Sequence, residues 1–435
     1  MNDLLSPSDN MWRLMRELYP ICRSITGDGV RKTLAILGRD MPLVHHRFPS
    51  GTQCYDWEVP FEWNIDGALL RYEDGTVIAN FEHHNLHVLG YSLPVDGWFT
   101  LDELRTHLFS LPEQPDIIPY VTSYYRSEWG FCLSHRAKEA LKPGRYHARI
   151  DSRFSPGELV LGEAFLPGRT EREILISCYI CHPSMANDSL SGVVLAAELY
   201  RELSKRSHLF SYRFCFLPET IGAIAYLSRF GQRLKKALHA GLVVTCVGDS
   251  GRIHYKQTRC GNHLLDRVVA NVLRHGKWPH EIRGFRPLGS DERQYCSPGF
   301  DMPVGSLMRS VYGEFPEYHT SADNLDFVNA SALEESFHVY MEVLRALEGN
   351  QTCRTTVPFC EPQMGRRGLY PMVGDKAEKS ALIQRYMWIL NLSDGNNSFL
   401  DIAERMDDGL LAVIEAADNL IRAGLLEEVK EVQHE

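Results

Sequence analysis

The sequence has no long hydrophobic run. Among its 435 residues, no stretch reaches the roughly 18 consecutive apolar residues that a membrane-spanning helix requires. The first residues also lack a basic segment followed by an apolar one, so they do not resemble a signal peptide. We therefore expect no membrane association and a location in the cytoplasm.

The cysteines show no paired motif. There are 11 of them, scattered from Cys22 to Cys360, and no Cys-x-x-Cys pair occurs. An odd, scattered set in a chain of this size argues against a disulfide framework. It is typical of reduced thiols in the cytosol.

An excess of positive charge is also missing. Lys and Arg number 46 and Asp and Glu 56, which gives a net charge of −10. A net acidic chain is a poor candidate for binding nucleic acid or an anionic membrane. Hydrophobic residues at 44% and charged residues at 23% are close to the globular average, which excludes a disordered or collagen-like chain.

What the sequence does contain is a change of pattern along the chain. Residues 1–51 begin with two predicted helices. Residues 52–150 show short aromatic and β-branched runs separated by Asp-Gly turns, which predicts an antiparallel β module. From residue 151 to 350, apolar runs of strand length alternate with helical periodicity, and this predicts an α/β domain with a mixed sheet covered by helices.

The C-terminal part differs again. Residues 351–376 are rich in Pro, Gly and Arg and are predicted to be a linker. Residues 377–435 contain three short predicted helices with a tight turn, the pattern of a winged helix-turn-helix. Because this region is acidic and the helix predicted at 410–423 offers only Arg422 as a base, we expect it to mediate packing or dimerisation and not to bind nucleic acid.

The most informative segment follows a predicted buried strand and carries His182 and Asp188. Ligands bind at the carboxyl ends of strands in open α/β sheets, and imidazole and carboxylate suit zinc or a similar divalent ion. Alternatively, Asp188 caps the following helix and His182 is an ordinary turn residue. The segment alone does not decide between these interpretations.

Three further candidates follow successive elements of the same region. Glu219 ends a predicted strand, where it could take a proton from metal-bound water or simply complement a helix dipole. Asp249 follows the next strand as a ligand or a turn residue. His319 precedes the last long helix as a ligand or a loop residue. Chance would not often place all of these side chains at the ends of strands in one domain, so together they favour a metal site.

This order resembles the zinc aminopeptidase clan, which includes bacterial leucyl aminopeptidases and glutaminyl cyclases. The clan's pattern runs His, Asp before Ser-Gly, Glu-Glu-x-Gly, Asp, and a Tyr-His-Thr-x-x-Asp-like segment. The matching positions here are His182, Asp188, Glu219, Asp249 and His319. The resemblance implies that Glu219 is the general base and that the other four hold one zinc ion or two, or another divalent ion.

Longer phrases resemble one branch of the clan, whose members are often labelled polysaccharide-biosynthesis proteins with an aminopeptidase-like domain. They include Trp57-Glu-Val-Pro-Phe-Glu-Trp63, Ile118-Pro-Tyr-Val-Thr-Ser-Tyr-Tyr125 and Gly365-Arg-Arg-Gly-Leu-Tyr-Pro371. The resemblance covers nearly the whole chain. It implies a zinc-peptidase-like α/β domain at 1–51 and 151–350, interrupted by the β module at 52–150 and followed by the winged helix at 377–435.

One position departs from the clan. Where the clan has a second Glu as a metal ligand, this chain has Thr220, which cannot act as a carboxylate ligand. Glu317, two residues before His319, is a candidate to compensate for the missing carboxylate.

Further candidates lie near Ser290-Asp291-Glu292, a segment that resembles the clan's Ser-Asp-His. We predict that Asp291, Arg293 and Tyr295 contribute to substrate binding together with Glu317. Arginine suits a bidentate grip on a substrate carboxylate, although a surface ion pair is the alternative for Arg293.

Together these residues predict a metal-dependent hydrolase that cuts an amide in a small peptide-like or amino-sugar substrate. Two alternatives stay open. One is acyl transfer or cyclisation at the same site, as in glutaminyl cyclases, and the other is a non-catalytic metabolite-binding or regulatory protein that uses the winged helix. A homodimer through the winged helix or the β module is compatible with all three.

Overall fold

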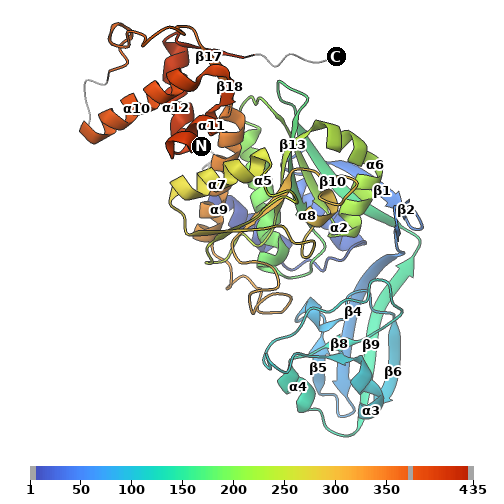
Figure 1. Ribbon diagram of the computed structural model, residues 1–435. Coiled ribbons are helices and arrows are strands. Elements are labelled where there is room, and N and C mark those ends of the chain that lie inside the picture. The colour runs from blue at the N-terminus through green and yellow to red at the C-terminus, as the bar shows by residue number, and fades with distance from the viewer. Residues whose placement is uncertain (1–5, 371–375, 430–435) are drawn as a thin grey trace, which may run out of the picture. The chain divides into compact units, whose positions relative to one another are not determined.

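A computed structural model describes residues 6–370 and 376–429 (Figure 1). The chain divides into two compact units. Unit 1 comprises residues 1–261 and 283–337, and unit 2 comprises residues 262–282 and 338–435. The predicted α/β domain and β module both belong to unit 1, and the predicted winged helix belongs to unit 2.

A mixed sheet forms the core of unit 1. The strands of this sheet that belong to unit 1 follow the order β1-β10-β12-β11-β13-β16-β14. The three central pairings, from β12 to β16, are parallel, whereas β1, β10 and β14 pair antiparallel with their neighbours. The bounds are β1 (Val44–Pro49), β10 (Glu158–Leu166), β11 (Glu173–Tyr179), β12 (Ser211–Leu217), β13 (Leu238–Val244), β14 (Ile253–Lys256) and β16 (Val304–Met308).

The two strands at the centre of this sheet, β11 and β12, are buried at every residue. Strands that are covered on both faces carry nearly continuous apolar runs, and this is why the sequence shows such runs here without alternation. The exception in β12 is Arg213, whose guanidinium group is paired with Glu163 and Glu173. The predicted mixed sheet flanked by helices is thus confirmed. Its parallel central strands point their carboxyl ends to one edge, where loops can bring side chains together.

Helices pack against this sheet, as Figure 1 shows for α5 and α6. α5 contacts β11 and β13, while α2 and α6 contact β10. Helix α1 begins at Pro7, where a missing N–H costs nothing, and the side chain of Ser6 accepts a hydrogen bond from Asp9 N. The bounds are α1 (Pro7–Leu18), α2 (Asp28–Leu37), α5 (Gly192–Leu203), α6 (Ile221–Ala237) and α8 (Glu292–Tyr295).

The β module is a four-stranded antiparallel sheet in the order β5-β4-β9-β6. Its strands are β4 (Glu62–Tyr72), β5 (Val77–Asn80), β6 (Val95–Thr100) and β9 (Arg145–Ser155), with short helices α3 (Leu101–Leu104) and α4 (His135–Glu139). It has a core of its own, in which Leu70, Phe131, Leu133 and Ala148 are fully buried. Smaller pairs are β2 (Gln53–Cys54) with β3 (Trp57–Glu58), and β7 (Leu108–Phe109) with β8 (Phe131–Cys132).

Unit 2 contains the C-terminal winged helix. Three helices, α10 (Lys376–Leu392), α11 (Phe399–Met406) and α12 (Leu410–Arg422), accompany a small sheet in the order β18-β17-β19. Its strands are β17 (Thr352–Thr355), β18 (Asp394–Ser398) and β19 (Leu426–Glu428). Helix α7 (Leu264–Gly276) belongs to the same unit, β15 (His280–Arg283) ends where the chain returns to unit 1, and α9 (Ala330–Gly349) connects the units.

Two predicted boundaries need correction. The expected linker at 351–376 contains β17, whose residues pair with β18 and β19, so this part belongs to the winged helix. Its residues 371–375 lie outside the described part of the chain. At the other boundary, the strand pair β4–β9 continues the module to Ser155, because Glu62 pairs with that residue. The Pro, Gly and Arg composition of the C-terminal stretch therefore concealed a strand.

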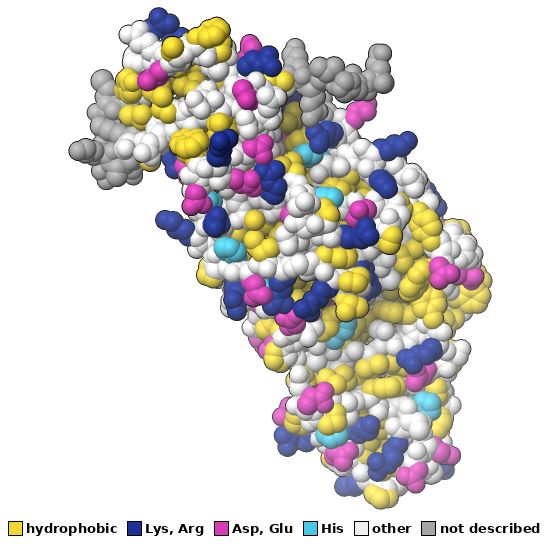
Figure 2. All heavy atoms as spheres, viewed as in Figure 1, with side chains coloured by type: hydrophobic (Ala, Val, Ile, Leu, Met, Phe, Trp, Pro, Cys, Tyr) yellow, Lys and Arg dark blue, Asp and Glu magenta, His cyan; other side chains and the backbone are white. Residues whose placement is uncertain are grey.

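Figure 2 shows acidic and basic side chains interspersed over the viewed face. No helix in the described ranges 6–370 and 376–429 is long and apolar enough to cross a membrane.

Gly192, at the start of α5, tests how closely this helix approaches the sheet. A Cβ at this position would lie 2.1 Å from the Val244 carbonyl oxygen, so a side chain would force α5 away from β13. We expect Gly192→Ala to lower the free energy of unfolding by about 2 kcal/mol, as overpacking does. Chemical denaturation measures it, with Gly299→Ala as the control because nothing lies within 4 Å of that position. An equal effect of both substitutions would contradict the close packing.

Candidate metal centre

Three side chains converge beside the carboxyl end of β11. His182, Asp188 and His319 each offer one ligand atom, and these atoms lie within 4.8 Å of one another. Nε2 of His319 is 3.1 Å from Oδ2 of Asp188, and the rings of the two histidines have centroids 5.3 Å apart. Four residues of the predicted centre were expected to be ligands, and the structure brings these three together.

His182 stands three residues beyond the end of β11 and is 4% exposed. Its carbonyl oxygen accepts a hydrogen bond of 2.9 Å from Nε of Arg23, a buried side chain from the N-terminal segment. Burial lowers the pKa of His182 to about 4, although the nearby Asp188 opposes the shift. The imidazole is therefore neutral at physiological pH, the form that binds metals.

Asp188 lies in the irregular turn η3 (Ala186–Ser191) between β11 and α5, and it is 1% exposed. The hydroxyl groups of Tyr179 and Thr245 both donate to its Oδ1, which leaves Oδ2 facing the histidines. Burial alone would raise the pKa of Asp188, but the charges of His182 and His319 and its hydrogen bonds bring the pKa down to about 2. Asp188 therefore stays a carboxylate, with one oxygen oriented by its neighbours and the other available.

His319 comes from the loop before α9 and has a left-handed backbone with φ of 55°. Its ring stacks on Tyr318 at a centroid distance of 3.9 Å, and Tyr120 of the β-module insertion meets its edge at 5.1 Å. The carbonyl oxygen of His319 accepts a 2.8 Å hydrogen bond from Tyr120 N. The inserted segment thus holds the loop that supplies the third side chain of the group.

Glu219 follows β12, the parallel neighbour of β11, and its Oε2 lies 3.6 Å from Nε2 of His182. Its side chain is 25% exposed, so it can meet a ligand that enters the centre. Burial, together with the charges of Asp291 and Asp188, raises the pKa of Glu219 well above its ordinary value. A carboxyl group with a raised pKa beside a metal centre is suited to proton transfer.

Thr220, where the clan carries a carboxylate, is occupied by other contacts. Its hydroxyl accepts a 2.8 Å hydrogen bond from Nη2 of Arg293, and its N–H donates to Oδ1 of Asp291 at 2.7 Å. Burial raises the pKa of Asp291 to about 7. Arg293 therefore lies beside Glu219, whereas Asp291 is fully buried and positions the backbone at Thr220. The role of Arg293 in substrate binding stays a prediction.

Asp249 does not join the group, which corrects its predicted role as a ligand. Its Oδ1 accepts hydrogen bonds from Gly251 N and the Ser310 hydroxyl, and its Oδ2 accepts from the Asn187 amide and Ser310 N. Both carboxylate oxygens are thus used to hold loops together. The residue that does reach the centre from this part of the sheet is Thr245, which directly follows the end of β13.

Two other predicted roles also need correction. Tyr295 is fully buried in the core, and its hydroxyl is 3.0 Å from the Ser177 hydroxyl of β11, so its side chain does not face the centre where it was expected. Glu317 is not a member of the group, and it contributes its carbonyl oxygen to a turn with Thr320. The compensation expected from Glu317 for the missing carboxylate at Thr220 is therefore not seen in the described geometry.

Sequence reasoning missed Tyr179, Thr245 and Tyr120 as parts of the centre. Tyr179 ends the buried strand β11 and looks like an ordinary core aromatic in the sequence. Thr245 stands just after a run of valines, where a β-branched residue is expected in any case. Only the density of tyrosines around Tyr120 and Tyr124 was a signal, and their hydroxyls lie 2.8 Å apart near the centre.

The donor set fits one divalent cation. Among the described residues, Oδ2 of Asp188 and Nε2 of His319 are buried and lack a well-formed hydrogen bond, although they face each other. Buried polar atoms without such partners are unfavourable unless something else satisfies them. Two imidazoles and one carboxylate, with further acidic groups close by, provide both the ligand atoms and the negative charge that a divalent ion requires.

Comparison with known families agrees with this picture. Residues 12–350 match a family described as a domain of unknown function (DUF4910), and residues 351–428 match a winged helix-turn-helix family. The chain belongs to the DUF4910 family. The match covers the β module and all residues of the centre, and the predicted C-terminal winged helix is confirmed.

A similar sequence and a similar crystal structure from Clostridium acetobutylicum have descriptions that name an aminopeptidase-like domain and a peptidase. A Clostridium acetobutylicum protein, named as a candidate polysaccharide biosynthesis protein with an aminopeptidase-like domain, is 47% identical over 96% of this chain and 95% of its own. A crystal structure of a candidate peptidase from the same organism is 45% identical, with a TM-score of 0.92 over 97% of this chain and 96% of that one. The predicted resemblance to this branch is confirmed.

More distant structures share the fold. A zinc aminopeptidase from Bacillus subtilis has a TM-score of 0.58 at 10% identity, covering 80% of this chain and 96% of its own. A Shewanella amazonensis M28 peptidase precursor has a TM-score of 0.53 at 13% identity, covering 78% and 92%. The α/β part of this chain therefore has an aminopeptidase-like fold.

Asp188 and Asp249 make a matched pair that tests the centre. We expect the purified protein to retain one divalent ion per chain, Asp188→Asn to lose it, and Asp249→Asn to retain it, because only Asp188 faces both histidines. Elemental mass spectrometry after extensive dialysis measures the ion content, and circular dichroism checks the fold of both variants. Loss of the ion from Asp249→Asn with an intact fold would contradict the arrangement.

Proposed function

We propose that this protein is a zinc-dependent hydrolase that cuts an amide bond in a small peptide-like or amino-sugar substrate. The observation that carries the proposal is the convergence of His182, Asp188 and His319, with the carboxyl group of Glu219 next to His182. Three protein ligands and one free coordination position are typical of catalytic zinc sites, whereas structural sites are closed by four. The aminopeptidase-like fold supports the same reaction class.

The neighbours of Asp188 support a single ion. A carboxylate that bridges two ions needs both of its oxygens, but Oδ1 of Asp188 already accepts hydrogen bonds from Tyr179 and Thr245. A second ion would also need the carboxylate that Thr220 replaces. We therefore favour a single ion, which would polarise the amide carbonyl and make a bound water acidic.

Glu219 is the candidate general base. Its carboxyl group lies at the edge of the centre, is a quarter exposed, and comes from a strand end held by β11 and β12. In this position it can take a proton from the attacking water and return it to the departing amine. Its backbone N–H donates to the Cys181 Sγ at 3.2 Å, which helps to fix the turn that carries it.

The surroundings support a small, polar substrate. Arg293 presents a guanidinium group beside Glu219 and is suited to hold a carboxylate or the developing negative charge of the amide oxygen. The rings of Tyr120 and Tyr318 flank His319 and would cover the substrate from the side of the inserted module. We place substrate selection in this group of side chains.

Glu219→Gln separates catalysis from metal binding. We expect this variant to keep its ion and to lose at least about 100-fold in kcat, because an amide side chain cannot accept the proton. The measurement is hydrolysis of aminoacyl p-nitroanilides and N-acetylated amino sugars by the zinc-loaded full-length protein. Glu317→Gln, an acidic position outside the group, serves as the control and should retain most of the activity.

The same experiment distinguishes hydrolysis from transfer. With water enriched in ¹⁸O, hydrolysis incorporates the label into the new carboxyl group, whereas cyclisation or acyl transfer to another nucleophile leaves the product unlabelled. Loss of the ion from Glu219→Gln, or no turnover of either substrate class by the zinc-loaded wild type, would count against the proposal.

A further inference from the structure

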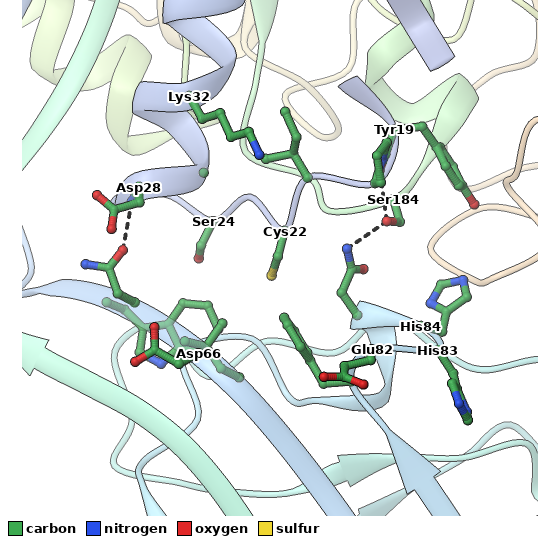
Figure 3. Close-up of a pocket in the computed structure, with 18 of the residues that line it drawn as sticks. Tyr19, Cys22, Ser24, Asp28, Lys32, Asp66, Glu82, His83, His84 and Ser184 are labelled. Atoms are coloured by element: carbon green, nitrogen blue, oxygen red, sulfur yellow. Dashed lines mark hydrogen bonds between the residues drawn. The ribbon is translucent and has the colours of Figure 1, made fainter. Parts of the chain in front are cut away.

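A cavity lies between the N-terminal segment of unit 1 and the β module (Figure 3). Its volume is about 570 Å³, within the range of small-molecule binding sites. One side is formed by residues 19–32, from the end of α1 into α2, and the other by residues 63–66 and 81–85 of the module. None of His182, Asp188, Glu219 and His319 lines it.

The floor of this cavity contains polar atoms that no described residue satisfies. Ser24 is 5% exposed, and its hydroxyl has no hydrogen-bond partner in the described part of the chain. Figure 3 shows this hydroxyl directed into the open space, with the thiol of Cys22 beside it. Oδ1 of Asn85, across the cavity, is likewise buried and unpaired among the residues described. Unpaired buried polar atoms are costly, so their presence at one cavity points to a ligand that satisfies them.

The same region is held rigidly in place. The amide of Asn85 donates to the Ser184 hydroxyl at 2.7 Å, and that hydroxyl donates to the Tyr19 carbonyl oxygen at 2.9 Å. This chain of hydrogen bonds, drawn in Figure 3, links the module to the N-terminal segment across the cavity. Oδ1 of Asn85 therefore keeps a fixed orientation and acts as a preorganised acceptor.

The charges around the cavity disfavour an anionic ligand. Three carboxylates, from Asp28, Asp66 and Glu82, line it against a single ammonium group from Lys32. Asp28 and Asp66 are already paired with arginines that lie outside the lining. With these ion pairs included, the charges at the cavity nearly balance, so the lining offers no excess of positive charge to hold an anion, whereas its carboxylate oxygens can accept hydrogen bonds from ligand hydroxyl groups.

The remaining lining combines apolar surface with neutral polar groups. Trp63, Phe81, Ile21 and Ile65 contribute apolar atoms, and Asn64 and His84 contribute polar side chains. Burial lowers the pKa of His84 to about 4, so its ring is neutral. A molecule with several hydroxyl groups on a carbon framework matches this mixture, since a hydroxyl can donate to an acceptor such as Oδ1 of Asn85 or accept from a donor such as the Ser24 hydroxyl.

We propose that this cavity is a second binding site, separate from the metal centre, that takes a small polyhydroxylated molecule of the size of a mono- or disaccharide. The hydroxyl of Ser24 and Oδ1 of Asn85 are its buried contacts, and the acidic rim accepts further hydroxyl groups. The site does not depend on the proposed hydrolase activity.

Calorimetric titration of the full-length protein with glucose, maltose and sucrose tests the proposal, with inorganic phosphate as the anionic comparison. We expect saturable binding of at least one of the sugars and none of phosphate. Ser24→Ala should weaken that binding about five- to tenfold, the usual effect of losing one hydrogen bond in a buried site. Ser24→Leu, which projects into the cavity, should abolish it.

A matched control is provided by Ser393 in unit 2, which is also buried with a hydroxyl that no described residue pairs, but does not line the cavity. Ser393→Ala should leave sugar affinity unchanged, and so should Asp188→Asn, which alters a side chain of the metal centre. Without sugar, Ser24→Ala should have a Tm equal to or above that of the wild type, because it deletes an unsatisfied group. If Ser24→Leu does not fold, Ser24→Ala carries the test.

Four results would overturn the proposal. One is the absence of binding for all three sugars, which would leave a cavity that holds only water. Another is preferential binding of phosphate. The third is an unchanged sugar affinity in Ser24→Ala, because binding would then occur elsewhere. The fourth is a loss of affinity in Asp188→Asn equal to that in Ser24→Ala, which would contradict a separate site.

Discussion

The carboxylate of Asp323 holds together the two segments on which the metal centre depends. Its Oδ1 and Oδ2 accept hydrogen bonds of 2.6 and 2.9 Å from the backbone N–H groups of Asn187 and Asp188, and its own carbonyl oxygen accepts one from Ala186 N. Asp323 is fully buried and lies four residues after His319. One side chain thus fixes the turn that presents Asp188 and joins it to the loop that presents His319. This link brings together ligand groups that are far apart in sequence.

The centre concentrates negative charge to a degree that a folded protein rarely leaves uncompensated. Asp188, Glu219, Asp291 and Glu292 all lie in one region, and Arg293 beside Glu219 and Lys256 on Glu292 compensate part of this charge. Burial and mutual repulsion raise the pKa values of Glu219 and Asp291, which lessens the repulsion by favouring their protonated forms. A divalent cation near Asp188 would act in the opposite direction and restore an ionised Glu219. The same acidic residues therefore favour the binding of a cation and set the pKa of the candidate base, Glu219.

Only some residues of the metal centre could be predicted from the sequence, because only some of them follow apolar strands. His182 and Glu219 were found because parallel strands deliver their carboxyl ends to one edge, so a polar residue after an apolar run marks that edge. Asp249 also follows an apolar strand, but the prediction that it is a metal ligand was wrong. The chain turns after Thr245, and the Asp249 carboxylate accepts hydrogen bonds from backbone and side-chain donors of neighbouring loops. Tyr295 was predicted near the substrate, but its hydroxyl contacts the Ser177 hydroxyl inside the core. Such outcomes are decided by three-dimensional partners that residue spacing does not reveal.

The β module contributes to both sites of unit 1, which explains why it is more than an appendage of the α/β sheet. The backbone N–H of Tyr120 donates a hydrogen bond to the His319 loop, and the turn that carries Asn85 lines the cavity of Figure 3. The N-terminal segment has the same double role, since Arg23 donates to the carbonyl oxygen of His182 while Ser24, the next residue, faces the cavity. Because these two residues are adjacent in the chain, a displacement of the segment would move both the Arg23 contact with His182 and the Ser24 side chain in the cavity. The two sites are thus built on common supports, although no residue of the metal group lines the cavity.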